Sequence, residues 1–277
     1  MEKKMDNVLV DIGGTHIRIG IGEDVHQPFS VLKTPSDREE LLNLLQAEIT
    51  RIIKERNIDA TKIYISCPGL VDKHGKINKI LYVSLEGVNL VDEIARRMGK
   101  EAIVINDANI QGLGCYNKNS LLYMNIGTAI GGSFVCDNRL FLGNDGFSCE
   151  FGHVFIGNEQ VCNCGRVGCL DTVASGWCFV EKFGENWWNR ADDSDIQEQL
   201  KIAGRAVGDA LAQISILFNP KEICVTGRVS IYGIFKENVR EEYYNKSWYN
   251  IPIIFKKDSW QNVYFGFKKI IKGEYVI

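Results

Sequence analysis

The sequence predicts an α/β fold with two similar halves, and three observations lead to this prediction. Short runs rich in β-branched residues alternate along the chain with amphipathic segments of helical period. Two strand–turn–strand units occur, one opening each half, and each carries glycine in its turn. The chain of 277 residues is long enough for one large or two medium domains with hydrophobic cores.

The first half is predicted to hold a hairpin, three further strands and three helices. Ser36 is the expected N-cap of the first helix, which runs to about Arg56 and repeats leucine and isoleucine at helical spacing. The other two helices are expected at Leu90–Met98 and Ala108–Tyr116. The expected strands are Val8–Asp11 and Ile17–Gly22 around the turn Gly13-Gly14-Thr15, a third within Val25–Thr34, then Lys62–Ser66 and Ala102–Ile105.

The second half begins with another strand–turn–strand unit. Strands are predicted at Leu121–Ile126 and Ile130–Cys136, on either side of Gly127-Thr128-Ala129. A long amphipathic helix, Asp195–Phe218, is expected to end before Asn219-Pro220. A buried strand is predicted at Glu222–Thr226, and the tail from about Trp260 is predicted to form a short strand and a helix.

The charge balance gives no support to nucleic-acid binding through a basic surface, because 32 basic and 35 acidic residues leave a formal net charge of −3. No run approaches the ~20 apolar residues of a membrane span, and the N-terminus does not resemble a signal peptide. Nine cysteines, an odd number, are typical of a reducing compartment. We therefore expect a cytoplasmic protein without nucleic-acid or membrane partners.

The stretch Glu150–Asp171 holds three cysteines and a histidine close together. Three thiols and one imidazole complete the tetrahedral shell of a structural zinc ion, and a closed shell predicts a metal that folds the loop. The alternative is a group of ordinary buried cysteines beside an unrelated histidine. Glu150 and Asp171 are predicted to bind neighbouring sugar hydroxyls, or else they are surface carboxylates. The four candidate ligands are His153, Cys162, Cys164 and Cys169.

The two glycine-bearing turns are candidate phosphate sites. Backbone N–H groups at a glycine turn can cradle phosphate oxygens, and a carboxylate beside the turn can hold Mg²⁺. Neither turn is a Walker loop or a dinucleotide fingerprint, since a strand follows. The alternative to a phosphate site at the first turn is a plain hairpin. Two such turns, one in each half, are predicted to hold a triphosphate. The first site comprises Asp11, Gly13, Gly14 and Thr15, and the second Gly127, Thr128, Gly131 and Gly132.

Asn106 and Asp107 follow a predicted buried strand, where ligand sites of α/β proteins usually lie. An ionised aspartate at such a position can take the proton from a hydroxyl that attacks phosphorus. Asp107 is therefore a candidate general base. The alternative is that Asp107 is the N-cap of the helix that starts at Ala108.

These motifs resemble those of the ROK family of sugar kinases and repressors, in the family's order and at about its spacing. The resemblance implies a two-lobed actin-like ATPase (ribonuclease H-like) fold with a zinc-binding loop. The lobes would comprise residues 1–112 with the returning segment 262–277, and residues 113–261. The matching stretches are Asp11–Arg18, Ser66–Asp72, Asn106–Asn109, Gly127–Gly132, Glu150–His153 and Cys162–Asp171.

The resemblance also implies an activity and its residues. The family's kinases transfer the γ-phosphoryl group of ATP, with Mg²⁺, to a hexose hydroxyl, usually O6, and form homodimers with a structural zinc. Asp107 would be the general base. The sugar contacts would be Gly69, Asn106, Asp107, Glu150, His153 and Asp171; the nucleotide contacts Asp11, Gly13, Gly14, Thr15, Gly127, Thr128, Gly131, Gly132 and Gly227; and the zinc ligands His153, Cys162, Cys164 and Cys169.

Three departures from the family pattern bear on function. The family usually has glutamate where Asp171 stands, Ala129 replaces a glycine of the second turn, and the adenosine-side triple glycine is Thr226-Gly227-Arg228. Asp171 bears on which sugar hydroxyl is contacted, whereas Ala129 and Thr226-Gly227-Arg228 favour an alternative function, a non-catalytic sugar sensor with an impaired nucleotide site. About ten residues precede Asp11, so we expect no N-terminal winged helix of the kind that the family's repressors carry. The sugar itself, whether glucose, N-acetylmannosamine, allose or another, stays open.

Overall fold

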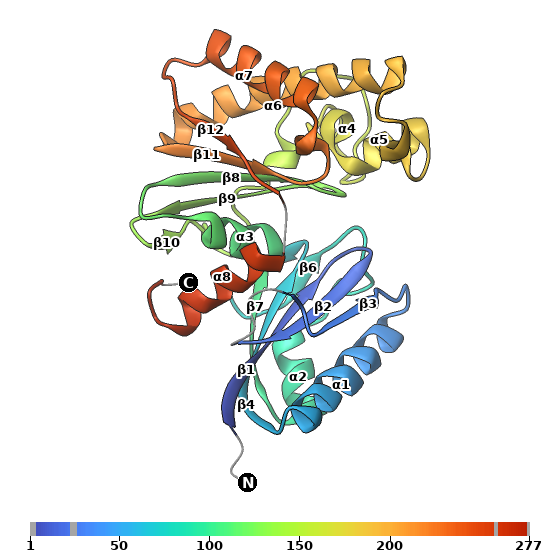
Figure 1. The fold of residues 1–277 in the computed structure, drawn as a ribbon, viewed down its shortest axis with the longest axis vertical. Helices are drawn as coiled ribbons and strands as arrows, with labels where there is room; N and C mark the ends of the chain where they lie inside the picture. The colour runs from blue at the N-terminus through green and yellow to red at the C-terminus, as the bar shows by residue number, and fades with distance from the viewer. Residues whose placement is uncertain (1–3, 23–26, 258–259, 276–277) are drawn as a thin grey trace. The chain divides into compact units, whose positions relative to one another are not determined.

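The computed structural model describes residues 4–22, 27–257 and 260–275, which form two compact units with one five-stranded sheet each (Figure 1). Unit 1 comprises the described residues of Met1–Gly114, Leu142–Ser148 and Ser259–Ile277, and unit 2 those of Cys115–Phe141 and Cys149–Asp258. The division into lobes of residues 1–112 and 113–261 stays a prediction.

The sheet of unit 1 has the order β3-β2-β1-β4-β7. β1 pairs antiparallel with β2, and β2 with β3, whereas β1, β4 and β7 run parallel. A separate antiparallel pair is formed by β5 (Leu70–Val71) and β6 (Ile77–Lys79). The strands of the main sheet are β1 Lys4–Ile12, β2 His16–Ile21, β3 Ser30–Lys33, β4 Ile58–Cys67 and β7 Glu101–Asn106.

Strand alternation gives the sheet of unit 1 two buried faces. Val8 and Val10 point into a core that they share with α1 (Arg38–Glu55) and α2 (Leu90–Met98). On the other face lie α3 (Asp107–Cys115) and α8 (Trp260–Ile271) (Figure 1). The ring centroids of Tyr64 in β4 and Phe267 in α8 are 5.8 Å apart. Helices therefore cover both faces of the sheet that contains the parallel strands.

Unit 2 repeats the strand connectivity of unit 1, in the order β10-β9-β8-β11-β12. Its first three strands are again antiparallel neighbours, and β11 and β12 again run parallel to β8. Both hairpin predictions are thus confirmed. The strands are β8 Leu121–Ile126, β9 Ile130–Cys136, β10 Arg139–Leu140, β11 Glu222–Thr226 and β12 Ile253–Phe255.

Helices α6 and α7 pack against each other and cover one face of the sheet of unit 2 (Figure 1). The segment between β10 and α6 is mostly loop, with short helices that bring the cysteine stretch back to the sheet. The helices are α4 Asp171–Ala174, α5 Gly176–Phe183, α6 Ser194–Phe218 and α7 Gly233–Lys246, and the 3₁₀ turns are η1 Phe151–His153, η2 Trp187–Arg190 and η3 Val229–Ile231.

Some local predictions need correction. The N-cap of α1 is Asp37, not Ser36: its carboxylate accepts the Glu40 N–H at 2.9 Å, while the Ser36 carbonyl accepts the Ser84 hydroxyl. The strand expected near Trp260 is wrong, because the described part of the tail is helical and the strand lies earlier, in β12. Of the strand expected within Val25–Thr34, β3 occupies Ser30–Lys33, and residues 25 and 26 lie outside the described residues.

Among the residues that the structure describes, no helix has both the length and the apolar character needed to cross a bilayer.

Candidate functional site

The carboxyl ends of three parallel strands in unit 1 bring polar side chains to one sheet edge. In the β1–β4 register Asp11 pairs with Ser66, and in the β4–β7 register Cys67 pairs with Asn106. Asp107 follows directly as the first residue of α3. Ligands of α/β proteins bind outside such strand ends, so this edge is the candidate site of unit 1.

Asp11 is almost fully buried at this edge, with both carboxylate oxygens engaged. Oδ1 accepts a hydrogen bond from the Ser66 hydroxyl at 2.8 Å, and Oδ2 pairs with Arg18 at 3.0 Å. Burial raises the pKa of Asp11, and the charge of Arg18 and these hydrogen bonds oppose that rise. Sequence reasoning missed Arg18, although the hairpin register that places it opposite Asp11 follows from the short turn.

The first glycine turn is closed by the protein itself. The Gly13 N–H donates to the His16 carbonyl at 2.9 Å, and the Thr34 hydroxyl donates to the Gly13 carbonyl at 2.7 Å. Gly14 and Thr15 are exposed. The turn is thus held by Thr34, the residue after β3, while its outer residues stay open to solvent, as a phosphate cradle requires.

Asn106 holds the residues around Asp107 in place. Its Oδ1 accepts the Asn109 N–H at 3.0 Å, which is the N-cap bond of α3, and its Nδ2 donates to the Gly69 carbonyl at 3.0 Å. The Asp107 carboxylate accepts the N–H of Ala108 at 2.8 Å. The alternative that Asp107 is the N-cap of this helix is therefore wrong, since the capping position belongs to Asn106 and Asp107 is the first helical residue.

The Gly69 backbone approaches β6 so closely that it has no room for a side chain. Gly69 has φ +90°, and a β-carbon there would overlap the Lys79 carbonyl oxygen. Its own carbonyl is the acceptor for Asn106. The conformation of Gly69 thus allows the bond that fixes the strand end before Asp107.

Asp11 and Asp107 border the same buried thiol. Burial raises the pKa of Cys67 well above its usual value, and the nearby carboxylates of Asp107 and Asp11 raise it further. Asp107 is half-buried, whereas Asp11 is 5% exposed. Unit 1 therefore brings two of the predicted acidic site residues together at one edge.

The second glycine turn, in unit 2, has the predicted bounds. It spans residues 127–129, with the Gly127 N–H donating to the Ala129 carbonyl at 3.1 Å, and β9 begins at Ile130. Gly131 and Gly132 lie in this strand, and their contact with phosphates stays a prediction. A β-carbon on Gly132 would overlap the Phe151 ring, so this glycine allows the segment of Glu150 to pack against β9.

Asp171 and Glu150 occupy different surroundings in unit 2. The Asp171 side chain is 1% exposed, so its description as a surface carboxylate is wrong. Burial raises the pKa of Asp171 to about 7, against the opposing effects of the Ile130 N–H and the nearby Trp177 indole. Glu150 is half-buried just before η1, and its carbonyl accepts the His153 N–H at 3.0 Å.

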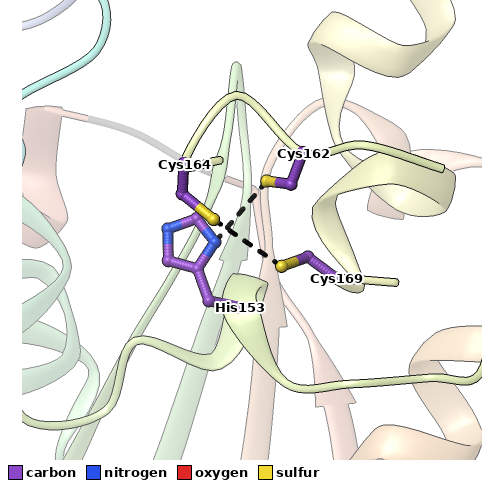
Figure 2. A group of neighbouring side chains, drawn as sticks. All are labelled: His153, Cys162, Cys164 and Cys169. Carbon is purple, nitrogen blue, oxygen red and sulfur yellow. Dashed lines mark hydrogen bonds between the residues drawn. The ribbon is translucent and has the colours of Figure 1, made fainter. Parts of the chain in front are cut away.

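The predicted metal ligands converge on one point (Figure 2). Their ligand atoms all lie within 4.8 Å of one another, with Cys164 Sγ to Cys169 Sγ at 3.7 Å and Cys162 Sγ to His153 Nδ1 at 3.8 Å. Ligand atoms about 2.3 Å from a tetrahedral zinc would stand roughly 3.8 Å apart. The chemistry and spacing of these side chains therefore fit a structural zinc. His153 lies within the group of cysteines, and the binding of zinc by this group stays a prediction.

A tight loop presents the sulfurs. The Cys162 N–H donates to the Arg166 carbonyl at 2.7 Å, and the Gly165 N–H donates to the Cys162 carbonyl at 2.8 Å. Gly165 and Gly168 have φ of +89° and +81°, which favours glycine. Burial, with the neighbouring thiols, raises the pKa of Cys169 to about 12. A bound cation would favour the thiolate forms that metal binding needs.

Gly227 lies beside the second turn, because β11 is parallel to β8 and both end at the same sheet edge. A β-carbon on Gly227 would overlap the Ile126 carbonyl oxygen. The next residue, Arg228, is exposed, and its guanidinium carbon lies 4.0 Å from the ring centroid of Trp188. Sequence reasoning missed this stack, since nothing in the local pattern links residues 188 and 228.

A family model described as "ROK family" matches residues 7–254 of this chain. The chain belongs to the ROK family. Among its ROK relatives, a glucokinase from Thermotoga maritima is 32% identical over 85% of this chain and 87% of the relative. A xylose repressor from Caldicellulosiruptor bescii is 26% identical over 88% of this chain and 72% of the repressor.

Solved ROK structures share the fold. A ROK family glucokinase from Streptomyces griseus, in complex with glucose and AMPPNP, superposes with a TM-score of 0.80 at 22% identity, over 96% of this chain and 98% of that one. The predicted actin-like ATPase class is thereby confirmed.

Proposed function

We propose that this ROK protein is a kinase that transfers the γ-phosphoryl group of ATP to a hexose hydroxyl, O6. The observation that carries the proposal is the placement of Asp11 and Asp107 at the carboxyl ends of β1 and β7, the two parallel strands that flank β4, beside a glycine turn. The Thermotoga maritima relative, which is a glucokinase, supports it.

Asp107 would act as the general base. As the first residue of α3 it stands at the N-terminal end of the helix, where the helix dipole favours a negatively charged group. The bonds from Asn106 to Asn109 and Gly69 hold the backbone on both sides of it. Such positioning matters because catalysis of phosphoryl transfer rests mainly on geometry and electrostatics.

The phosphates of ATP would be bound by backbone N–H groups of the two glycine turns and by Thr15 and Thr128. Asp11 would help to hold a Mg²⁺ ion, which when bound neutralises the charge of the phosphates. Because Ser66 and Arg18 already occupy both Asp11 oxygens, we propose that Asp11 reaches the ion through water. Gly131, Gly132 and Gly227 would act by letting the backbone approach closely.

The sugar would contact Gly69, Asn106, Asp107, Glu150 and His153. His153 Nδ1 faces the cysteines, and we propose that the other ring nitrogen, Nε2, contacts a sugar hydroxyl. We propose that the cysteine cluster holds a structural zinc through His153 and the three thiolates. Its role would be to order the loop between η1 and α4, and it would take no part in the chemical step.

The test is ADP release measured with a panel of hexoses and N-acetylhexosamines, using zinc-loaded, folded protein. Phosphorylation of at least one hexose is expected, and ³¹P NMR of the product should show the phosphate at C6. The matched control for each active hexose is its 6-deoxy analogue, which should bind without turnover. Absence of turnover across the whole panel would overturn the proposal.

A second candidate function is a sugar sensor that does not turn over ATP. It is favoured by the similarity to a xylose repressor and by Arg228, whose bulky side chain, stacked on Trp188, stands where the family has glycine. Calorimetry with Mg·ATP separates the two functions. Binding in the micromolar to millimolar range is expected of the kinase, whereas sugar binding without nucleotide binding would establish the sensor.

A further inference from the structure

Asp171 joins the end of the cysteine loop to the second glycine turn. It begins α4, two residues after Cys169, and its side chain is 1% exposed. Its Oδ1 accepts the backbone N–H of Ile130 at 2.7 Å. Ile130 is the first residue after the turn 127–129, so one buried carboxylate holds the point where that turn becomes a strand.

The space around this bond is closely packed. A β-carbon on Gly152 would stand 2.7 Å from Asp171 Oδ1 and 2.5 Å from the Ile130 carbonyl oxygen. Gly152 belongs to η1, between Glu150 and His153. Three segments therefore meet at the Asp171 carboxylate, and a longer side chain at position 171 would have to displace one of them.

The residues that follow Asp171 bind the same turn at two more points. The Gly176 N–H donates to the Gly127 carbonyl at 2.8 Å, and the Trp177 N–H donates to the Thr128 carbonyl at 3.0 Å. These bonds engage the carbonyl oxygens of the turn with the start of α5. Oxygens that are engaged in this way do not face a phosphate. The N–H groups of Gly127 and Ile130 are engaged as well, so those of Thr128 and Ala129 are the ones that the turn would offer to a phosphate.

We propose that Asp171 is a positioning residue of the nucleotide site, which shapes the 127–130 backbone for phosphate binding. The inference rests on the proposed function, because it assigns the turn to the phosphates of ATP. It gives Asp171 a role that differs from the sugar contact implied by the family resemblance. It also links the cysteine loop to nucleotide binding, since the order of that loop determines where α4 begins.

The choice of aspartate at this position follows from the same geometry. The Asp171 carboxylate reaches the Ile130 N–H with one methylene between backbone and carboxyl group. A glutamate would carry its carboxylate further, into the space bordered by Gly152 and the Ile130 carbonyl. Asp171→Glu is therefore expected to weaken nucleotide binding, although it restores the residue usual in the family.

The experiment compares Asp171→Ala, which removes the acceptor, with Asp171→Asn, which keeps a carbonyl oxygen of the same reach. Calorimetry gives the Kd of Mg·ATP and of the sugar, and hydrogen exchange gives the protection of the Ile130 amide. The alanine variant should raise the Mg·ATP Kd at least tenfold and speed exchange at Ile130, with the sugar Kd within twofold of wild type. In the asparagine variant the Mg·ATP Kd, the sugar Kd and the Ile130 exchange rate should each stay within about threefold of wild type.

Two further variants keep the result interpretable. Thr172→Val removes neighbouring hydrogen bonds to Asn158 and Cys169, and should leave the Ile130 exchange and the Mg·ATP Kd unchanged. Gly176→Ala places a β-carbon 2.5 Å from the Gly127 carbonyl oxygen. Gly176→Ala disturbs the turn from its other side and should weaken the binding of Mg·ATP as Asp171→Ala does. It therefore takes the place of Asp171→Ala if the Asp171→Ala protein fails to fold.

The outcomes separate this inference from the proposed function. Loss of sugar affinity in both Asp171 variants, with Mg·ATP binding and Ile130 protection intact, would make Asp171 a sugar ligand and overturn the inference. Unchanged Ile130 exchange in Asp171→Ala would also overturn it. If the wild-type protein binds no nucleotide, the proposed function fails and the assignment of the turn to phosphates fails with it. Hydrogen exchange would still decide whether Asp171 holds the turn.

Discussion

Gly266 of α8 lies so close to Ile110 of α3 that a β-carbon on the glycine would overlap the Ile110 carbonyl oxygen. The same crossing is close at a second point, where a β-carbon on Gly114 of α3 would overlap the Asn262 carbonyl oxygen. Because a glycine stands on each helix, the two backbones can pack in direct contact. The helix that begins at Asp107 is thus positioned by the last helix of the chain.

Gly266→Ala tests this packing. Alanine favours a helix by about 1 kcal/mol over glycine, but overpacking against rigid backbone costs typically 1–3 kcal/mol and sometimes more. We expect lower stability in urea unfolding, together with a lower kcat, because α3 must shift. Gly233→Ala is the control, since Gly233 starts α7 with nothing near its missing β-carbon. Equal stability of both variants would contradict the close crossing.

The predicted elements with a strong local pattern agree with the structure, whereas the errors occur where distant residues decide. Leu90–Met98 carries its own signals, with Asn89 as N-cap and a left-handed Gly99 after the last turn. Gly131 and Gly132 lie in β9 as predicted, but the need for glycine at the second of them depends on Phe151, whose ring leaves no room for a β-carbon there. Only the folded chain brings Phe151 to that point.

The candidate site shows the same limit. The spacing of the cysteines predicted their convergence, since residues so near in sequence reach one point through a single loop. The burial of Asp171 depends on Ile130, and the stack of Arg228 depends on Trp188, each about 40 residues away along the chain. No periodicity or motif of the sequence encodes such pairs, so sequence reasoning assigned Asp171 a role without its partner.

Asp107→Asn should separate catalysis from binding. If Asp107 is the general base, the amide cannot take the proton, and kcat should fall by a factor on the order of 10²–10⁴. The sugar Kd should stay within about twofold, because asparagine keeps the size of the side chain. Asp92→Asn, in the first turn of α2, is the control and should leave kcat unchanged. Full turnover in Asp107→Asn would remove the base assignment.

Removal of the metal should destabilise the protein, because the binding energy of a structural metal is folding energy. We expect close to one zinc per chain by elemental analysis. Stripping the zinc with a chelator should lower Tm by roughly 10 °C. This corresponds to a loss of about 3 kcal/mol of stability, because each kcal/mol shifts Tm by about 2–4 °C in a protein of this size. Restored zinc should restore Tm.

The cysteine variants provide the matched comparison for that experiment. Cys164→Ser should lose the zinc and the stability together, whereas Cys136→Ser, at a half-buried cysteine of β9 outside the cluster, should keep both. A chain that is purified without zinc, and whose Tm does not respond to added zinc, would contradict a structural metal at this cluster.

Arg228→Ala should distinguish the kinase from the sensor by the sign of its effect. The guanidinium lies on Trp188, and Arg228 itself follows the end of β11, the strand parallel to β8. In a working nucleotide site its positive charge would attract the phosphates of ATP. Removal of the Arg228 side chain should then weaken the binding of Mg·ATP about fivefold, which corresponds to about 1 kcal/mol. Arg228→Lys, which keeps a positive charge, should lose less affinity.

The same stack would have the opposite effect if Arg228 obstructed the site. Arg228→Ala would then bind Mg·ATP more tightly than the wild-type protein, and the sensor would be favoured. Arg205→Ala, at an exposed arginine of α6, controls for the general loss of a positive charge in unit 2 and should leave the Kd unchanged. Calorimetry at two ionic strengths completes the test, because the attraction by Arg228 should weaken with salt, whereas steric obstruction should not.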